Sequence, residues 1–296
     1  GQEQPFFMFV HTQAAHLPYS PPLSHREDFT DEIDLQPAEA AQPAHERSQN
    51  YYEAIANSCD FDSETQDAIG AMYDGLVRYV DERVQSIFET LQSADLGPTV
   101  FVVTADHGDL LGEHGVLGHQ FLLHDGLINV PLVVHGLDSL VDLPEDTLIQ
   151  HADLMTALLS EAGLPEDELD TMIGTDPRED PREFAVSQRG HETYEEAIKQ
   201  VRQHDPEFDG GDFQSGLLHA VRTKTHKLLK TETDERLYRL PDERHNRRND
   251  HPAVTRRHLE VFDDKLIGLQ RVGDSAGGEM SDAMQKQLSD LGYVVE

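Results

Sequence analysis

Short continuous runs of apolar residues mark the expected strands in the first part of the chain. Such runs occupy residues 5–10, 99–104 and 127–135. A continuous apolar run is consistent with a strand buried on both faces, and parallel sheets carry strands of this kind. Residues 11–22 and 23–50 are polar and contain several prolines, so both are expected to form loops, the second of them a candidate lid.

A longer spacing marks the expected helices. From Ser63 onward, apolar side chains recur at steps of three and four residues until Gly97 and Pro98, which predicts a long amphipathic helix. A second helix is predicted from Asp153, as its N-cap, to Gly163. Because strands alternate with helices, the pattern favours an α/β fold with a mainly parallel sheet flanked by helices.

Beyond residue 165 the pattern changes to short strand-like segments in an irregular, acidic background. Residues 219–222, 227–230 and 237–238 indicate a small antiparallel sheet. Helices are predicted near 252–270 and at 284–293. We therefore predict an α/β domain in residues 1–165 and a C-terminal α+β subdomain in residues 166–296, with a small antiparallel sheet and terminal helices.

The charge balance limits the partners that this chain can bind. It has 57 acidic and 23 basic residues, for a formal net charge of −34. Such a field repels nucleic acid and anionic membranes, and no apolar run is long enough to predict a membrane span. The acidic residues are spread along the chain, which favours a salt-adapted, halophilic archaeal protein working in the cytoplasm; whether a targeting signal precedes Gly1 cannot be read from this sequence.

Polar side chains follow two of the predicted strands. The first strand runs out into His11 and His16, and the second runs out into Asp106 and His107. Ligands of an open parallel sheet bind beyond the carboxyl ends of its strands, so both sets are expected at one edge. Gly108 tolerates a positive φ and would permit the bend that turns Asp106 and His107 onto one ion. A carboxylate with an imidazole suits a divalent cation.

The loop from Gly112 to His119 adds further imidazoles between flexible glycines, which can bring His119 close to an anion. Any one of these histidines, taken alone, is more often a surface or capping residue. The combination is more specific, because an Asp-His-Gly sequence at a strand end is followed by a loop of glycines and histidines and then by another strand.

These residues resemble the sulfatases, within the alkaline phosphatase superfamily. Residues 104–115 with 129–133 are similar to the late metal-site segment of that family. Phe6-Phe7 with His11 and His16-Leu17-Pro18-Tyr19 resemble its preceding strand, whose histidine next to the proline contacts the sulfate ester. The resemblance implies that Asp106 and His107 bind the metal and that His16 and His119 act as catalytic and substrate-binding residues. His119 stands where many members carry a lysine that acts on the leaving oxygen.

Two parts of the family pattern do not occur in these 296 residues. One is the opening strand with its two metal-binding aspartates. The other is the Cys- or Ser-x-Pro-x-Arg motif, whose first residue becomes the formylglycine nucleophile. Cys59 is followed by Asp60-Phe61-Asp62, so it is not that motif; it is expected to be a buried or incidental thiol. We therefore expect an incomplete alkaline phosphatase-like sandwich, N-terminally truncated, with little activity alone and the formylglycine only in an upstream segment.

The resemblance implies metal-dependent hydrolysis of the sulfate ester of a sulfated small molecule or glycan. Ca²⁺ is the expected ion, with Mg²⁺ or Mn²⁺ as alternatives. Two other readings stay open. One is a phosphodiesterase, a phosphonate monoester hydrolase or a phospho-transferring relative, since these share the Asp-His metal strand. The other is a non-catalytic remnant whose acidic surface serves binding or structure.

Overall fold

A computed structural model describes residues 6–30, 33, 35–94, 96–211 and 213–262. The chain divides into two compact units, residues 1–247 and residues 248–296. The described residues of the second unit, 248–262, contain one helix, α10, Pro252–Val261. It begins where a helix was predicted, near residue 252. The rest of that predicted helix, and the one at 284–293, lie outside the described residues. The predicted boundary near residue 165 stays a prediction.

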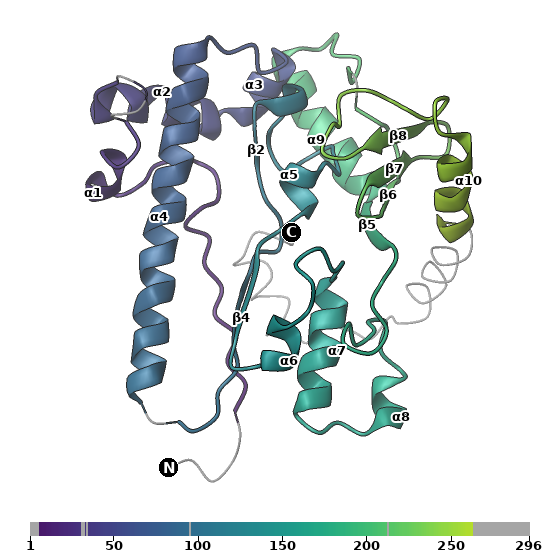
Figure 1. Ribbon diagram of the computed structural model, residues 1–296. Helices are drawn as coiled ribbons and strands as arrows, with labels where there is room; N and C mark the ends of the chain where they lie inside the picture. The colour runs from purple at the N-terminus through teal and green to yellow at the C-terminus, as the bar shows by residue number, and fades with distance from the viewer. Residues whose placement is uncertain (1–5, 31–32, 34, 95, 212, 263–296) are drawn as a thin grey trace. The chain divides into compact units, whose positions relative to one another are not determined.

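The long helix predicted from Ser63 is confirmed as α4, Ser63–Ser93 (Figure 1). The side chain of Asp62 caps its start by accepting a hydrogen bond of 2.8 Å from the backbone N–H of Thr65. The first half of α4 supplies Ile69 and Met72 to the larger of the hydrophobic clusters. The period of three and four residues thus identified the helix, but its apolar positions are buried only in the first half, and Ile87 in the second half is 37% exposed.

The prediction of loops over residues 23–50 is wrong, because this region contains α1, Leu23–Arg26, and α2, Pro37–Gln49. The helix α2 packs against α4 and buries Ala40 and Ala44 on one face. Alanines at a spacing of four residues are a weak apolar signal, and the surrounding acidic residues obscured it. A third helix, α3, follows at Tyr51–Ala56.

The described strands do not form the predicted, mainly parallel sheet; every pair among them is antiparallel. Strand β1, Phe101–Thr104, pairs with β4, Leu132–His135, in antiparallel register, with Val103 opposite Val133. A run of apolar residues reports burial but carries no information on the direction of its neighbour, which explains the error. The first part of the predicted strand 127–135 is helical instead, in α5, Asp125–Ile128. Residues from α6, Asp138–Val141, and α7, His151–Glu161, pack with Val102 and Val134.

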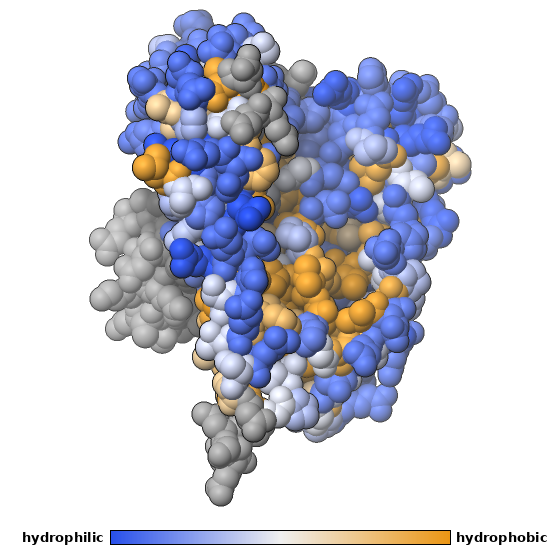
Figure 2. Space-filling view, turned by 60° about the vertical axis from the view of Figure 1, so that its left-hand side comes forward, coloured by the Kyte–Doolittle hydropathy of each residue, from blue (hydrophilic) through white to orange (hydrophobic). Residues whose placement is uncertain are grey.

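The predicted buried strand at residues 5–10 is also wrong in the part that is described. Residues 6–10 adopt no strand, and all five side chains are exposed, Phe7 to 77%. On β4, Val133 is exposed to 59%. We call Phe6–Val10 together with Val133 the exposed apolar segments. Figure 2 shows one face of the molecule on which hydrophobic surface gathers in a hollow bordered by hydrophilic side chains.

The small antiparallel sheet predicted in the C-terminal region is confirmed. Four strands lie in the order β5-β6-β7-β8, and every neighbouring pair is antiparallel. Leu218, Leu228 and Leu237 are fully buried on it. Among the described helices, none combines the length and the apolar character that crossing a membrane requires. The strands and remaining helices of this region are β5 Ala185–Arg189, β6 Leu218–Arg222, β7 His226–Lys230, β8 Glu235–Arg239, α8 Glu166–Leu169 and α9 His191–His204.

Candidate functional site

A short hairpin brings together two polar side chains that are ten residues apart. Strand β2, Leu110–Leu111, pairs with β3, Leu117–Gly118, so that Leu110 lies opposite Gly118. The residues that flank this pair, Asp109 and His119, therefore continue the hairpin on the same side. Gly112 and Gly118 have φ values of +119° and +94°, which favour glycine at these two positions.

The carboxylate of Asp109 is the anchor of this arrangement. Its side chain is only 4% exposed, and its Oδ1 lies 3.3 Å from Nδ1 of His119. The hydroxyl of Tyr19 donates a hydrogen bond of 3.0 Å to the other oxygen, Oδ2. Burial, followed by the charge of Asp109, raises the pKa of Tyr19 well above its usual range, so Tyr19 stays a neutral donor.

Two further imidazoles surround His119. The ring of His107 stacks on that of His119 with centroids 4.2 Å apart, and the ring of His16 lies 5.1 Å from His119. Nδ1 of His107 is 2.9 Å from the carbonyl oxygen of Gly108, and Nδ1 of His16 is 2.9 Å from that of Leu17. A carbonyl only accepts, so each Nδ1 donates, and each neutral ring presents its Nε2 as an acceptor or metal ligand.

Three of these residues have the donor geometry of a metal site. Ligand atoms of His107, Asp109 and His119 all lie within 4.8 Å of one another. Two imidazoles and one carboxylate are a donor set that suits divalent transition metals. Since the carboxylate is held by Tyr19 and the ring of His107 by a backbone carbonyl, the residues present fit a divalent ion.

The structure places the predicted ligand Asp106 beside this group but outside it. The side chain of Asp106 is half exposed and accepts a hydrogen bond of 3.1 Å from the backbone N–H of His107. Its Oδ2 lies 3.8 Å from Nε2 of His107. Thus the rings of His16, His107 and His119 converge, and Asp109, not Asp106, is the carboxylate that groups with His107 and His119.

Gly108 is required here for a reason that differs from the predicted one. Its φ is not among the positive values of the chain. Instead its backbone N–H donates a hydrogen bond of 2.9 Å to the carbonyl of Leu127 in α5. A Cβ atom at position 108 would lie 2.1 Å from the carbonyl oxygen of Gly126. We call residues 106–109 the metal loop. Its position therefore depends on the close approach of its backbone to α5.

The sequence interpretation underrated two residues of this site. The sequence pattern does not single out Asp109, and it includes Tyr19 only as part of the family resemblance. The signal that points to Asp109 is the pair of glycines, Gly112 and Gly118, which closes the hairpin. Cys59 is buried as predicted, and burial raises the pKa of its thiol to about 12, so it is a poor nucleophile.

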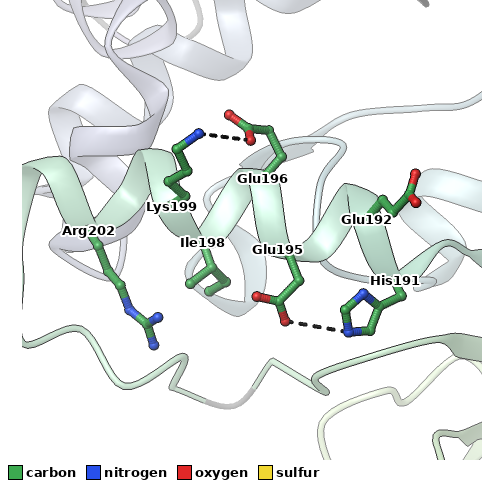
Figure 3. A pocket seen from close by; sticks show the side chains of 7 residues that line it. All are labelled: His191, Glu192, Glu195, Glu196, Ile198, Lys199 and Arg202. Carbon is green, nitrogen blue, oxygen red and sulfur yellow. Dashed lines mark hydrogen bonds and ion pairs between the residues drawn. The ribbon is translucent and has the colours of Figure 1, made fainter.

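A separate surface pocket lies along α9 and shares no residue with the histidine cluster (Figure 3). His191 pairs with Glu195 at 3.8 Å, and Lys199 pairs with Glu196 at 3.3 Å. These are exposed pairs within one helix, which contribute little to stability and form no enclosed site.

The fold and the cluster together define a mixed α/β protein with a candidate divalent-metal site. The protein-family model described as Sulfatase matches residues 1–164, more than half of the chain. The chain therefore belongs to the sulfatase family.

Two similar proteins are sulfatases. The uncharacterized sulfatase YidJ of Escherichia coli is 23% identical over 176 residues, which are 56% of this chain and 33% of YidJ. A 2-O GAG sulfatase, BT1596, shares the fold with a TM-score of 0.56 and 19% identity, over 78% of this chain and 51% of that protein.

A third similar protein is a phosphonate monoester hydrolase of Agrobacterium radiobacter. It is 26% identical with a TM-score of 0.54, over 72% of this chain and 43% of that protein. The chain thus spans a third of YidJ and about half of these solved structures.

Proposed function

We propose that this chain carries the metal-binding and substrate-holding part of a hydrolase that cleaves sulfate esters. The convergence of His16, His107, Asp109 and His119 supports the proposal most directly. Arrangements of imidazoles around an anchored carboxylate suit the binding of a cation together with an anionic ester. The family match and the sulfated substrate in the name of BT1596 agree with a sulfated glycan or small molecule as substrate.

In this proposal His107, Asp109 and His119 hold a divalent ion, with Asp106 beside it. When bound, such an ion stabilises negative charge on a sulfate oxygen. Among the three expected ions, the two imidazoles of the donor set favour Mn²⁺, because it is the one transition metal of the three and Ca²⁺ and Mg²⁺ prefer oxygen ligands. The hydroxyl of Tyr19 holds Asp109 in place. His16, whose Nδ1 is fixed by Leu17, directs its Nε2 edge to the sulfate group.

We further propose that the nucleophile and the remaining carboxylates come from polypeptide outside these 296 residues. Among the described residues, the one cysteine is buried and has a raised pKa. The exposed apolar segments, Phe6–Val10 with Val133, provide surface on which strands of the same fold can pack. The relatives are longer than this chain, which supports the proposal that further strands of the same fold cover these segments.

Phosphonate monoester hydrolysis is the second candidate, favoured by the similarity to the Agrobacterium enzyme. The test is to assay the 296-residue chain and a chain extended by its natural upstream coding sequence against 4-nitrophenyl sulfate and 4-nitrophenyl phenylphosphonate, with Mn²⁺, Mg²⁺ or Ca²⁺.

We expect metal-dependent turnover of the sulfate ester by the extended chain and little by the short one. Faster turnover of the phosphonate would favour the second candidate, and full activity of the short chain would contradict the proposed incompleteness. If the extended chain turned over neither ester, the protein would be a non-catalytic family member.

A further inference from the structure

A buried cluster of charges links the C-terminal sheet to the helix α5. Lys227, on β7, is fully buried, and its Nζ lies 2.9 Å from Oδ1 of Asp125 and in contact with Glu243. Arg222, on β6, donates to Asp125 as well, with a shortest distance of 2.9 Å. A buried ammonium group is strongly unfavourable unless carboxylates compensate it, so the sheet and α5 are bound to one another here.

The start of α5 is held by a second set of contacts. The backbone N–H of Asp125 donates a hydrogen bond of 2.8 Å to Oε2 of Glu243. Nδ1 of His124 lies 3.4 Å from Oε1 of Glu243, and the ring of His124 stacks on that of His114 at 4.0 Å. Since Lys227 also contacts Glu243, it fixes α5 both directly through Asp125 and indirectly through Glu243.

The other end of α5 supports the metal loop. The carbonyl of Leu127 accepts the hydrogen bond from Gly108, which lies between His107 and Asp109 in the sequence. The same approach leaves no room for a side chain at position 108. A shift of α5 would therefore break the Gly108 hydrogen bond or move the two neighbouring metal donors.

We infer that Lys227, together with Glu243, is a positioning residue for the proposed site: it fixes α5, and α5 fixes His107 and Asp109. This inference rests on the proposed function for the meaning of the site. It assigns the C-terminal sheet a second role, because the sheet would set the geometry of a metal loop that is distant in sequence. A merely stabilising role for the cluster is the alternative.

The test compares three variants of the full 296-residue chain. Lys227→Met removes the charge with little loss of volume, and Lys227→Arg keeps the charge. The matched control is Lys230→Met on the same strand, whose ion pair of 3.0 Å with Glu235 joins β7 to β8. Two readouts are the hydrogen exchange of the Gly108 amide and the affinity for Mn²⁺ in a calorimetric titration; unfolding in urea measures the general stability.

We expect Lys227→Met to lower both the protection of Gly108 and the Mn²⁺ affinity about tenfold, as for groups that orient metal ligands. Lys227→Arg should keep most of the Gly108 protection and of the Mn²⁺ affinity. Lys230→Met should change neither quantity beyond what its effect on stability explains. If Lys227→Met does not fold, Glu243→Gln is measured under the same criteria.

The inference is overturned if Lys227→Met lowers stability while the Gly108 protection falls only in proportion and the Mn²⁺ affinity is unchanged. If the wild-type chain binds no Mn²⁺, the hydrogen exchange of the Gly108 amide alone tests the inference: a loss of protection beyond the loss of stability supports it, and a proportional loss overturns it. Because no readout depends on ester hydrolysis, an inactive extended chain would refute the proposed function without affecting this result.

Discussion

Of the two larger strand regions in the described part of the chain, the more apolar one, β1 with β4, is the less completely covered. In the sheet β5–β8, the residues Val221 and Leu228 are almost completely buried. In the pair β1–β4, one side packs against α6 and α7, whereas Val133 remains exposed to 59%. The comparison teaches that apolar composition alone does not bury a strand, because a second layer has to cover it. The proposed upstream polypeptide would supply that layer.

Removing a charge from the buried cluster should have the largest effect on stability. Asp125→Ala leaves Lys227 and Arg222 without their shared carboxylate, so we expect the free energy of unfolding to fall by about 3–5 kcal/mol. The exposed pair between Asp146 and Lys224 offers the control, and Asp146→Ala should leave the urea midpoint unchanged. Equal effects of the two substitutions would show that the cluster does not behave as a buried one.

Trimming one apolar side chain from each sheet tests the comparison directly. Leu228→Ala should cost about 2–5 kcal/mol, because the side chain is fully buried. Val133→Ala should cost at most about 0.5 kcal/mol, because more than half of that side chain is already in water. Urea unfolding of both variants is the measurement. A large loss for Val133→Ala would mean that β4 is covered in solution.

Acid should weaken the cluster in a specific pH range. Burial alone would raise the pKa of Asp125, but Arg222 and Lys227 outweigh it and the net pKa is lowered; for Glu243, His124 and Lys227 likewise outweigh burial. A lowered folded-state pKa gives stability that is present above the unfolded-state pKa, about 4, and is lost as the pH falls through the folded value.

We therefore expect the free energy of unfolding to fall below about pH 4, and to do so less steeply in the double variant Asp125→Asn, Glu243→Gln. Urea titrations from neutral to acidic pH measure both profiles. Parallel profiles of the variant and the wild type would show that these two carboxylates do not contribute.

The exposed apolar segments should bind a hydrophobic dye. Replacing Phe7 and Phe9 by serine should lower the fluorescence of bound anilinonaphthalene sulfonate, with little change in stability, because both rings are exposed. Leu23→Ser on α1 is the control, since Leu23 is also exposed but lies outside these segments. A drop in stability for the phenylalanine variant would show that the rings are packed in solution.

The sequence predicted those features that depend on local spacing. It identified α4, from the apolar steps after Ser63, and three of the four strands of the C-terminal sheet, β6, β7 and β8. It also placed His16, His107 and His119 at one site. It could not predict that β4 runs antiparallel to β1, because an apolar run does not specify its neighbour.

Long-range contacts account for what the sequence did not predict. The burial of Lys227 depends on Asp125, which is 102 residues away in the chain. The importance of Asp109 depends on Tyr19, which is 90 residues away. Neither pair has a periodic signal, so only the folded chain identifies them.

The most direct test of the central claim is to locate Mn²⁺ by anomalous scattering in crystals of this chain. The account predicts an ion bound by His107, Asp109 and His119. An ordered ion bound at Asp106 without Asp109 and His119, or crystals that hold no ion at Mn²⁺ concentrations that saturate the protein in solution, would contradict it.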